Sequence, residues 1–87
     1  MNNVVYGFNG LPIEITEEIN EREVKHINIT YNSWNKRIKK VEKTIVDGVE
    51  VDEYIIYYGY YDNGELSYLK DNKGTEYYFD EKGLPIK

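Results

Sequence analysis

The residues that could carry acid–base or nucleophilic chemistry are few and scattered in this chain. His26 is the single histidine among 87 residues, and there is no cysteine. A nucleophile such as Ser33, Ser67 or a threonine would need His26 as its base and a carboxylate behind the imidazole. His26 falls on the polar side of an alternating segment, so we predict no catalytic role for it. The lack of cysteine excludes disulfides, thiolate nucleophiles and cysteine-based metal sites.

Several acidic residues occur as neighbouring pairs, namely Glu17-Glu18, Asp52-Glu53 and Asp80-Glu81. Glycosidases place two carboxylates on either side of a sugar in a cleft, whereas adjacent residues of a strand point to opposite faces. Asp47, Glu50 and Asp52 lack the spacing of a calcium-binding loop. No glycine-rich phosphate loop is present either. The sequence therefore predicts no enzyme, no metal site and no cofactor.

Length and composition predict one small domain in a reducing compartment. A chain of 87 residues allows a single domain, 1–87, and small secreted domains usually carry disulfides. The first residues show neither a basic segment nor the apolar stretch of a signal peptide. No apolar run approaches the roughly 20 residues that a membrane helix needs. We therefore expect a soluble protein located in the cytoplasm.

The charge of the chain is acidic at both ends and basic in the middle. The formal net charge is −5, which argues against direct binding of nucleic acid. The middle segment, 31–46, carries a basic band opposed only by Glu42: Lys36, Arg37, Lys39, Lys40 and Lys43. Such a band could bind nucleic acid or an acidic protein surface. We favour the other interpretation, in which lysines on an edge strand prevent sheets from joining.

The segment Val49–Tyr61 is the longest apolar run and the richest in residues that favour strands. Beyond Glu53, both of its alternating faces are apolar, with Ile55 and Tyr57 on one face and Ile56 and Tyr58 on the other. A strand covered on one side only would alternate apolar with polar residues. We therefore predict a central strand that is covered on both sides, by its own chain or by a partner.

Turn signals divide the rest of the chain into short strands. Asn9-Gly10 predicts a two-residue hairpin turn, and Asp47-Gly48 between β-branched runs predicts another. The chain is therefore expected to be an all-β, single-domain antiparallel meander of about seven short strands, curled or dimeric. We place the strands near residues 4–8, 11–16, 24–31, 37–46, 49–61, 65–70 and 75–79.

Two segments give more detailed expectations. In 24–31 the residues alternate, with Ile27, Ile29 and Tyr31 on one face and His26, Asn28 and Thr30 on the other. The segment 34–46 is ambiguous, because Trp34, Ile38, Val41 and Ile45 also have helical spacing. A helix there, which would make an α+β fold, stays open as the alternative to the favoured strand.

A short pattern recurs along the chain: an aromatic residue, Asp or Asn, a turn that ends in Gly, and an aliphatic residue. Gly10-Leu11-Pro12-Ile13 returns as Gly83-Leu84-Pro85-Ile86, and Tyr61-Asp62-Asn63-Gly64-Glu65-Leu66 follows the same outline. The pattern resembles the YD repeat of RHS-type bacterial proteins, best over 57–87, and is similar to the Tyr-rich hairpins of MORN repeats. Glu65 stands where the YD repeat has Arg. The resemblance implies a hairpin meander and transfers no active site.

The tyrosines are the strongest indication of a binding surface. Eight of the ten lie between Tyr54 and Tyr78. Tyrosine combines apolar area with a polar tip, and it is enriched at interfaces. We expect one face of Ile55–Tyr61 to meet a second copy or a target protein. The predicted partner-binding residues are Asp47, Glu50, Asp52, Glu53, Tyr54, Tyr57, Tyr58, Tyr60, Tyr61 and Tyr68.

Together these features predict a non-enzymatic, acidic binding protein that acts by occluding a surface of a protein partner. The partner is expected to be a nucleic-acid-binding protein, whose basic groove would receive the carboxylates. In size and charge the chain resembles small phage inhibitors of host defence, including anti-CRISPR proteins. The alternative is a repeat-derived structural or carbohydrate-binding module of YD or MORN type, whose tyrosines would stack on sugars.

Overall fold

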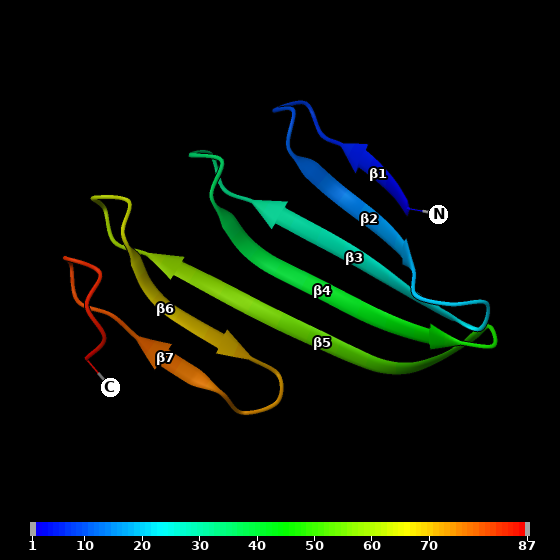
Figure 1. The fold of residues 1–87 in the computed structure, drawn as a ribbon. Helices are drawn as coiled ribbons and strands as arrows, with labels where there is room; N and C mark the ends of the chain where they lie inside the picture. Colours follow the sequence, from blue (N-terminus) through cyan, green and yellow to red (C-terminus); the bar gives the residue numbers. More distant parts are fainter. Residues whose placement is uncertain (1, 87) are drawn as a thin grey trace.

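Seven strands follow one another across one antiparallel sheet in the computed structural model, which describes residues 2–86 (Figure 1). The strands are β1 (Asn2–Tyr6), β2 (Pro12–Glu18), β3 (Glu23–Tyr31), β4 (Arg37–Val46), β5 (Val49–Tyr60), β6 (Leu66–Asp71) and β7 (Glu76–Tyr78). Each strand pairs with the next, so the predicted all-β meander is confirmed. The described residues contain no helix, and therefore none that could span a membrane.

The ambiguous segment forms β4, so the helical alternative is wrong. Asp47 and Gly48 both have positive φ, 51° and 81°, as a type I′ hairpin turn requires. This turn pairs β4 with β5, while β3 pairs with the other edge of β4. Hydrogen bonding of β4 to a strand on each side outweighs the helical spacing of its apolar residues. Because β4 is the fourth of seven strands, the interpretation of its lysines as protection of an edge strand is also wrong.

At the opposite end of the sheet, the turns share one geometry that differs from the expected two-residue hairpin. In the first of them, the Gly7 N–H donates to the Leu11 carbonyl at 2.9 Å, and only Gly10 has positive φ. The Asn9 side chain accepts the Leu11 N–H instead of sitting in a type I′ turn, so a five-residue turn forms. The same backbone bond closes turns 32–36, 61–65 and 80–84, with Asn35, Gly64 and Gly83 at the positive-φ position.

The strand register separates the side chains onto two faces. Ile15 lies beside Ile27, and the predicted alternation of 24–31 is confirmed by its pairing with β2 and β4. Neighbours across an antiparallel pair share a face, so the apolar residues of β2 and β3 lie on the same side as those of β5 and β6, with Lys40 and Glu42 of β4 between them. We call this side the isoleucine face. Its apolar members include Val4, Ile13, Ile15, Ile27, Ile29, Ile38, Ile56, Tyr58 and Leu69.

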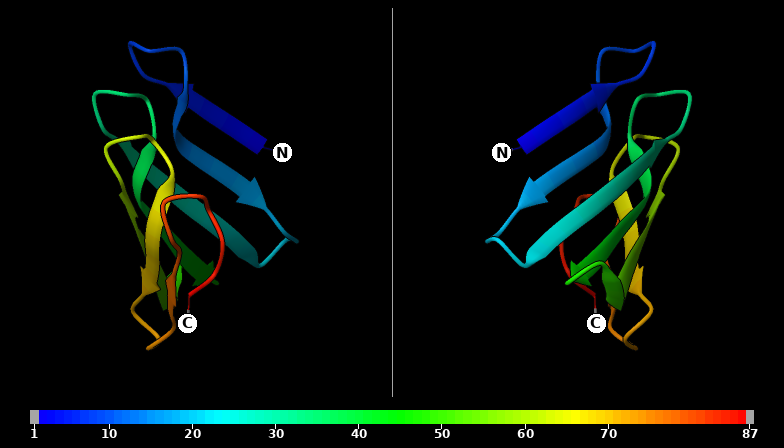
Figure 2. Two further views of the ribbon diagram at one scale, coloured as in Figure 1. Left: turned by 90° about the vertical axis from the view of Figure 1, so that its left-hand side faces the viewer. Right: turned by 90° about the vertical axis from the view of Figure 1, so that its right-hand side faces the viewer.

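No second layer covers either face of the sheet within the described residues, and Figure 2 shows one twisted sheet from both sides. Ile27 and Ile29 are the only buried hydrophobic residues there, at 6% and 5% exposure. The radius of gyration is 15.1 Å, compared with about 12 Å for a globular domain of this length. Of the two alternatives for the cover of β5, cover by its own chain is therefore wrong within the described residues, and cover by a partner stays a prediction. β5 is an interior strand of the sheet.

On the face opposite the isoleucine face, one aromatic ring packs directly on the backbone of the neighbouring strand. Gly59 of β5 lies beside Tyr68 of β6, and the tyrosine ring rests on the glycine backbone. A β-carbon built on Gly59 would stand 1.9 Å from Cε2 of Tyr68, which is far inside van der Waals contact. Only glycine leaves room for the ring, and aromatic side chains commonly cover glycines in sheets in this way.

We predict that Gly59→Ala destabilises the protein by about 1–3 kcal/mol, the usual cost of overpacking. The methyl group would force the Tyr68 ring off the sheet. The free energy of unfolding in urea measures the effect. In a Tyr68→Ala background the same change should be neutral or slightly stabilising, because alanine restricts the unfolded chain more than glycine does. Equal effects of Gly59→Ala in both backgrounds would contradict the ring contact.

Candidate functional site

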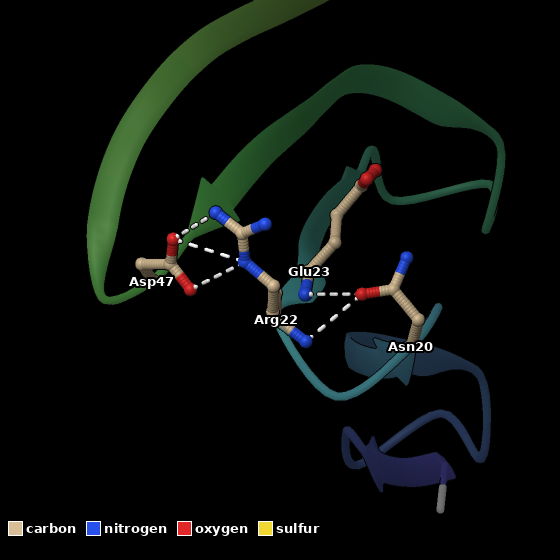
Figure 3. Close-up of polar contacts among 4 residues, drawn as sticks. All are labelled: Asn20, Arg22, Glu23 and Asp47. Carbon is tan, nitrogen blue, oxygen red and sulfur yellow. Dashed lines mark hydrogen bonds and ion pairs between the residues drawn. The ribbon is translucent and has the colours of Figure 1, made fainter.

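The predicted acidic surface begins with Asp47, which the chain neutralises with its own arginine (Figure 3). The Arg22 guanidinium donates to both carboxylate oxygens of Asp47. This hydrogen bonding lowers the pKa of Asp47 below its usual value of 3.8. The Asn20 side chain accepts the backbone N–H groups of Arg22 and Glu23 at 2.9 Å, which fixes the turn that carries the arginine. Asp47 therefore links two turns of the sheet.

The other predicted carboxylates are also paired within the chain. Asp52 accepts a hydrogen bond from the Lys73 ammonium at 2.7 Å, and this bond lowers the pKa of Asp52. The ammonium nitrogen of Lys43 lies 3.6 Å from a carboxylate oxygen of Glu50 and 3.8 Å from one of Glu53. Asp52 projects from the isoleucine face, whereas Glu53 follows it on the opposite face. The four acids thus form no single unpaired acidic surface.

Several predicted contact tyrosines use their hydroxyl groups to hold the sheet together. The Tyr60 hydroxyl donates to the Arg37 carbonyl at 2.6 Å, and the Tyr61 hydroxyl donates to the Phe79 carbonyl at 2.7 Å. Tyr54 donates to the Asp71 carboxylate at 2.7 Å. This bond raises the pKa of Tyr54 and lowers that of Asp71. The hydroxyl groups of these tyrosines connect neighbouring parts of the sheet and are therefore already used within the chain.

The remaining predicted tyrosines are divided between the two faces. Tyr58 lies on the isoleucine face, while Tyr57 and Tyr68 lie on the opposite face. There the ammonium of Lys39 lies 5.7 Å from the Tyr57 ring centre, and that of Lys70 lies 4.9 Å from the Tyr68 ring centre. The ten predicted partner-binding residues are therefore not brought together at one site.

A groove of about 560 Å³ lies on the opposite face of β1 to β5. Its polar lining includes His26, whose Nδ1 lies 3.2 Å from the Thr16 hydroxyl oxygen. The sequence identified His26 but could not single out Thr16 as its partner. The neighbour of His26 on the next strand is Lys43, a cation, where a catalytic triad needs a carboxylate. Among residues 2–86, no cluster of three or more His, Asp or Glu residues could hold a metal.

A second candidate lies at the end of the sheet where the five-residue turns gather. Phe8 is fully exposed in the turn after β1, and Trp34 is 57% exposed in the turn after β3. The Asn9 side-chain amide donates to the Asn35 side-chain oxygen at 3.0 Å and joins these two turns. Tyr6, at 61% exposure, precedes the first turn. We call Tyr6, Phe8 and Trp34 the aromatic end.

The surroundings of the aromatic end are apolar on one side and basic on another. A shallow hollow of about 430 Å³ runs from Phe8 onto the isoleucine face, where Ile13 and Ile29 line it. Lys36 and Arg37 follow Trp34 and are exposed. Neither Phe8 nor Trp34 was predicted as a site residue. Phe8 was expected to end the first strand, near 4–8, but β1 ends at Tyr6, and Trp34 is a single aromatic in a polar stretch. The available signal was an aromatic residue at a turn position where small polar residues are usual.

The carboxylates with internal partners predict how stability depends on pH. The pKa values of Asp47, Asp52 and Asp71 are lowered by folding, so their partners stabilise the folded state above pH 4. That stabilisation is lost as the pH falls below about 4 and the carboxylates are protonated. We expect the urea midpoint to fall over this range. The variant Asp47→Asn/Asp52→Asn/Asp71→Asn should be less stable at pH 7 and should lose less on acidification.

A matched control is Asp62→Asn, because Asp62 is exposed and forms no side-chain hydrogen bond or ion pair with the other described residues. This variant should retain the acid-induced loss of the native protein. A triple variant that loses as much stability on acidification as the native chain would show that the three pairs do not cause the loss.

The chain was compared with known protein families, proteins and structures. Neither the protein-family models, nor the curated proteins, nor the solved structures gave a match to the chain. The resemblance to YD and MORN repeats therefore stays a prediction from short sequence patterns.

Proposed function

We propose that this chain is a non-enzymatic binding protein that occupies a surface of a protein partner through its aromatic end. The observation that carries the proposal is the exposure of Phe8 and Trp34 on two turns that are hydrogen-bonded to each other. Aromatic residues dominate the energetics of protein interfaces when they enter a pocket of the partner. An exposed aromatic side chain contributes nothing comparable to the stability of the isolated sheet.

The turns that carry the two aromatics are well suited to hold them in place. The Asn32 side chain accepts the N–H groups of Trp34 and Lys36 at 2.9 and 3.0 Å, which fixes the second turn from inside. Asn9 fixes the first turn and also reaches the second through Asn35. A ligand that is already ordered loses less entropy on binding. Phe8 and Trp34 thus resemble a preformed pair of anchors.

The local charge, and not the net charge, defines the partner that this end would suit. Lys36 and Arg37 border Trp34 and are exposed, so a pocket with acidic groups at its rim would be complementary. The earlier hypothesis assigned the contact to Asp47, Glu50, Asp52 and Glu53, with a basic groove as the partner. Those carboxylates are paired with cations of the same chain, which weakens their attraction for a basic groove.

Photo-crosslinking tests this proposal without presuming the partner. A photoreactive phenylalanine analogue is placed at position 8 or position 34, and each protein is irradiated in an extract of the cells that encode it. We expect both positions to yield an adduct with the same protein. With that protein purified, Phe8→Ala and Trp34→Ala should each weaken binding about tenfold or more, the range of interface anchors.

The control position is Val51, which is 58% exposed on β5 at the other end of the sheet. The analogue at position 51 should give no such adduct, and Val51→Ala should change the affinity less than about threefold, as residues outside the anchors do. The proposal is wrong if positions 8 and 34 give no protein adduct, or if both alanine variants bind as tightly as the native chain.

A further inference from the structure

We propose that the isoleucine face binds the same face of a second copy of this chain, giving a two-layered dimer. The inference is independent of the aromatic end and starts from the uncovered sheet. Protein domains generally bury a sheet face against a second layer, and small chains with little core often gain that layer by oligomerisation. Here only Ile27 and Ile29 are buried among the described residues, both of them on this face.

The size of the face suits such an interface. The sheet measures 44 by 32 Å in its two longer dimensions. A stable protein–protein interface covers about 800 Å² of each partner, which this face can supply. The two sheets would lie about 10 Å apart, as in other β-sandwiches.

Two charged residues in the middle of the face identify the occupant. Lys40 and Glu42 of β4 project from the isoleucine face, because they pair with Ile29 and Ile27 of β3. Both are half-buried, and neither forms an ion pair with another residue in 2–86. Covering them with a purely apolar surface would leave two charges without water or a partner, at a high cost. The covering surface should therefore offer one charge of each sign at matching positions.

The register of the sheet shows that a second copy does so. Glu14, Asn28, Val41 and Ile55 lie in one row across β2 to β5. A two-fold axis that runs between the sheets along this row reverses the strand direction. In each strand, the residue one position before the row therefore lies opposite the residue one position after the row in the same strand of the partner. Lys40 then faces the partner's Glu42, and Glu42 faces the partner's Lys40.

The same axis matches the apolar residues on both sides of β4. Ile27 faces the partner's Ile29, and Ile13 faces the partner's Ile15, because these pairs flank the same row. On β5, Tyr54 faces the partner's Ile56. A two-fold axis that runs along β4 would instead bring Lys40 onto its own symmetry mate. The charges of β4 therefore favour the axis along the row over the axis along this strand.

This arrangement also separates the two aromatic ends of the dimer. Phe8 and Trp34 lie in turns beyond the ends of the strands, at one end of the sheet (Figure 1). Because the axis reverses strand direction, the dimer would carry one aromatic end at each of its two ends. The dimer would then have two separate anchors for partners.

Sedimentation equilibrium with charge-reversal variants tests the inference. The native chain should sediment as a dimer of the 10.3 kDa protomer. Lys40→Glu and Glu42→Lys each create two like-charge contacts, so each should weaken dimerisation about 100-fold. The double variant Lys40→Glu/Glu42→Lys restores both ion pairs and should dimerise within about threefold of the native chain. Lys39→Glu, on the opposite face of the same strand, should have no effect.

Mixing the two single variants gives the sharpest outcome. One variant presents two acidic groups and the other two basic groups, so the mixture should form a heterodimer that neither forms alone. Circular dichroism checks that each variant keeps its β structure, and Lys40→Gln replaces any reversal that unfolds, with an expected loss of about tenfold. A native chain that stays monomeric up to about 1 mM overturns the proposal. So does a dimer that Lys40→Glu and Glu42→Lys leave intact, which would indicate pairing through an edge strand instead.

Discussion

Residues 2–86 place no layer above or below the sheet, so each strand must be held by its neighbours in the same sheet. That constraint accounts for the hydrogen bonds at both ends of the strands. Asn9 joins Asn35, and Asn63 donates to the Glu81 carbonyl at the same end. At the other end, the Asp47 N–H donates to the Arg22 carbonyl at 2.8 Å, beside their ion pair. Exposed ion pairs contribute little to stability, so the main effect of this pair is to align the turns.

The same constraint explains why the chain uses tyrosine where a closed core would use leucine or phenylalanine. A half-buried aromatic ring covers its neighbours on the sheet, and its hydroxyl can reach a backbone carbonyl or stay in water. Tyr31 does this at Pro12, as Tyr60 does at Arg37 and Tyr61 at Phe79. Tyrosine abundance is therefore explained in large part by the open sheet. The aromatics that the sheet does not use, Phe8 and Trp34, are the more informative ones for function.

The sequence predicted the strands and the positions of the turns well because their signals are local, although Asn9-Gly10 lies in a five-residue turn and not in a two-residue hairpin. Alternation of Ile27 and Ile29 with polar residues, positive-φ glycines, and Asp47-Gly48 each act over a few residues. Whether a second layer covers a sheet depends on contacts between segments far apart in the sequence. Local patterns therefore could not predict that β5 lacks such a cover. The pairing of Arg22 with Asp47 likewise follows from a register that joins residues 25 positions apart. An acidic surface inferred from Asp47 alone overlooked the cation that the fold brings to it.

The two edges of the sheet differ, and the difference decides which association is favoured. The outer side of β7 is occupied by its own C-terminal segment, through the bridge of Phe79 with Pro85 and the bond from the Ile86 N–H to the Tyr78 carbonyl. The outer side of β1 has no such cover within residues 2–86, and the strand carries no charged residue. Yet β1 is five residues long and its register shifts at Tyr6, so edge pairing would bury little apolar surface. Hydrophobic stabilisation scales with the apolar area removed from water. A contact between two isoleucine faces would remove far more of it, and the paired charges of β4 would give that contact its register.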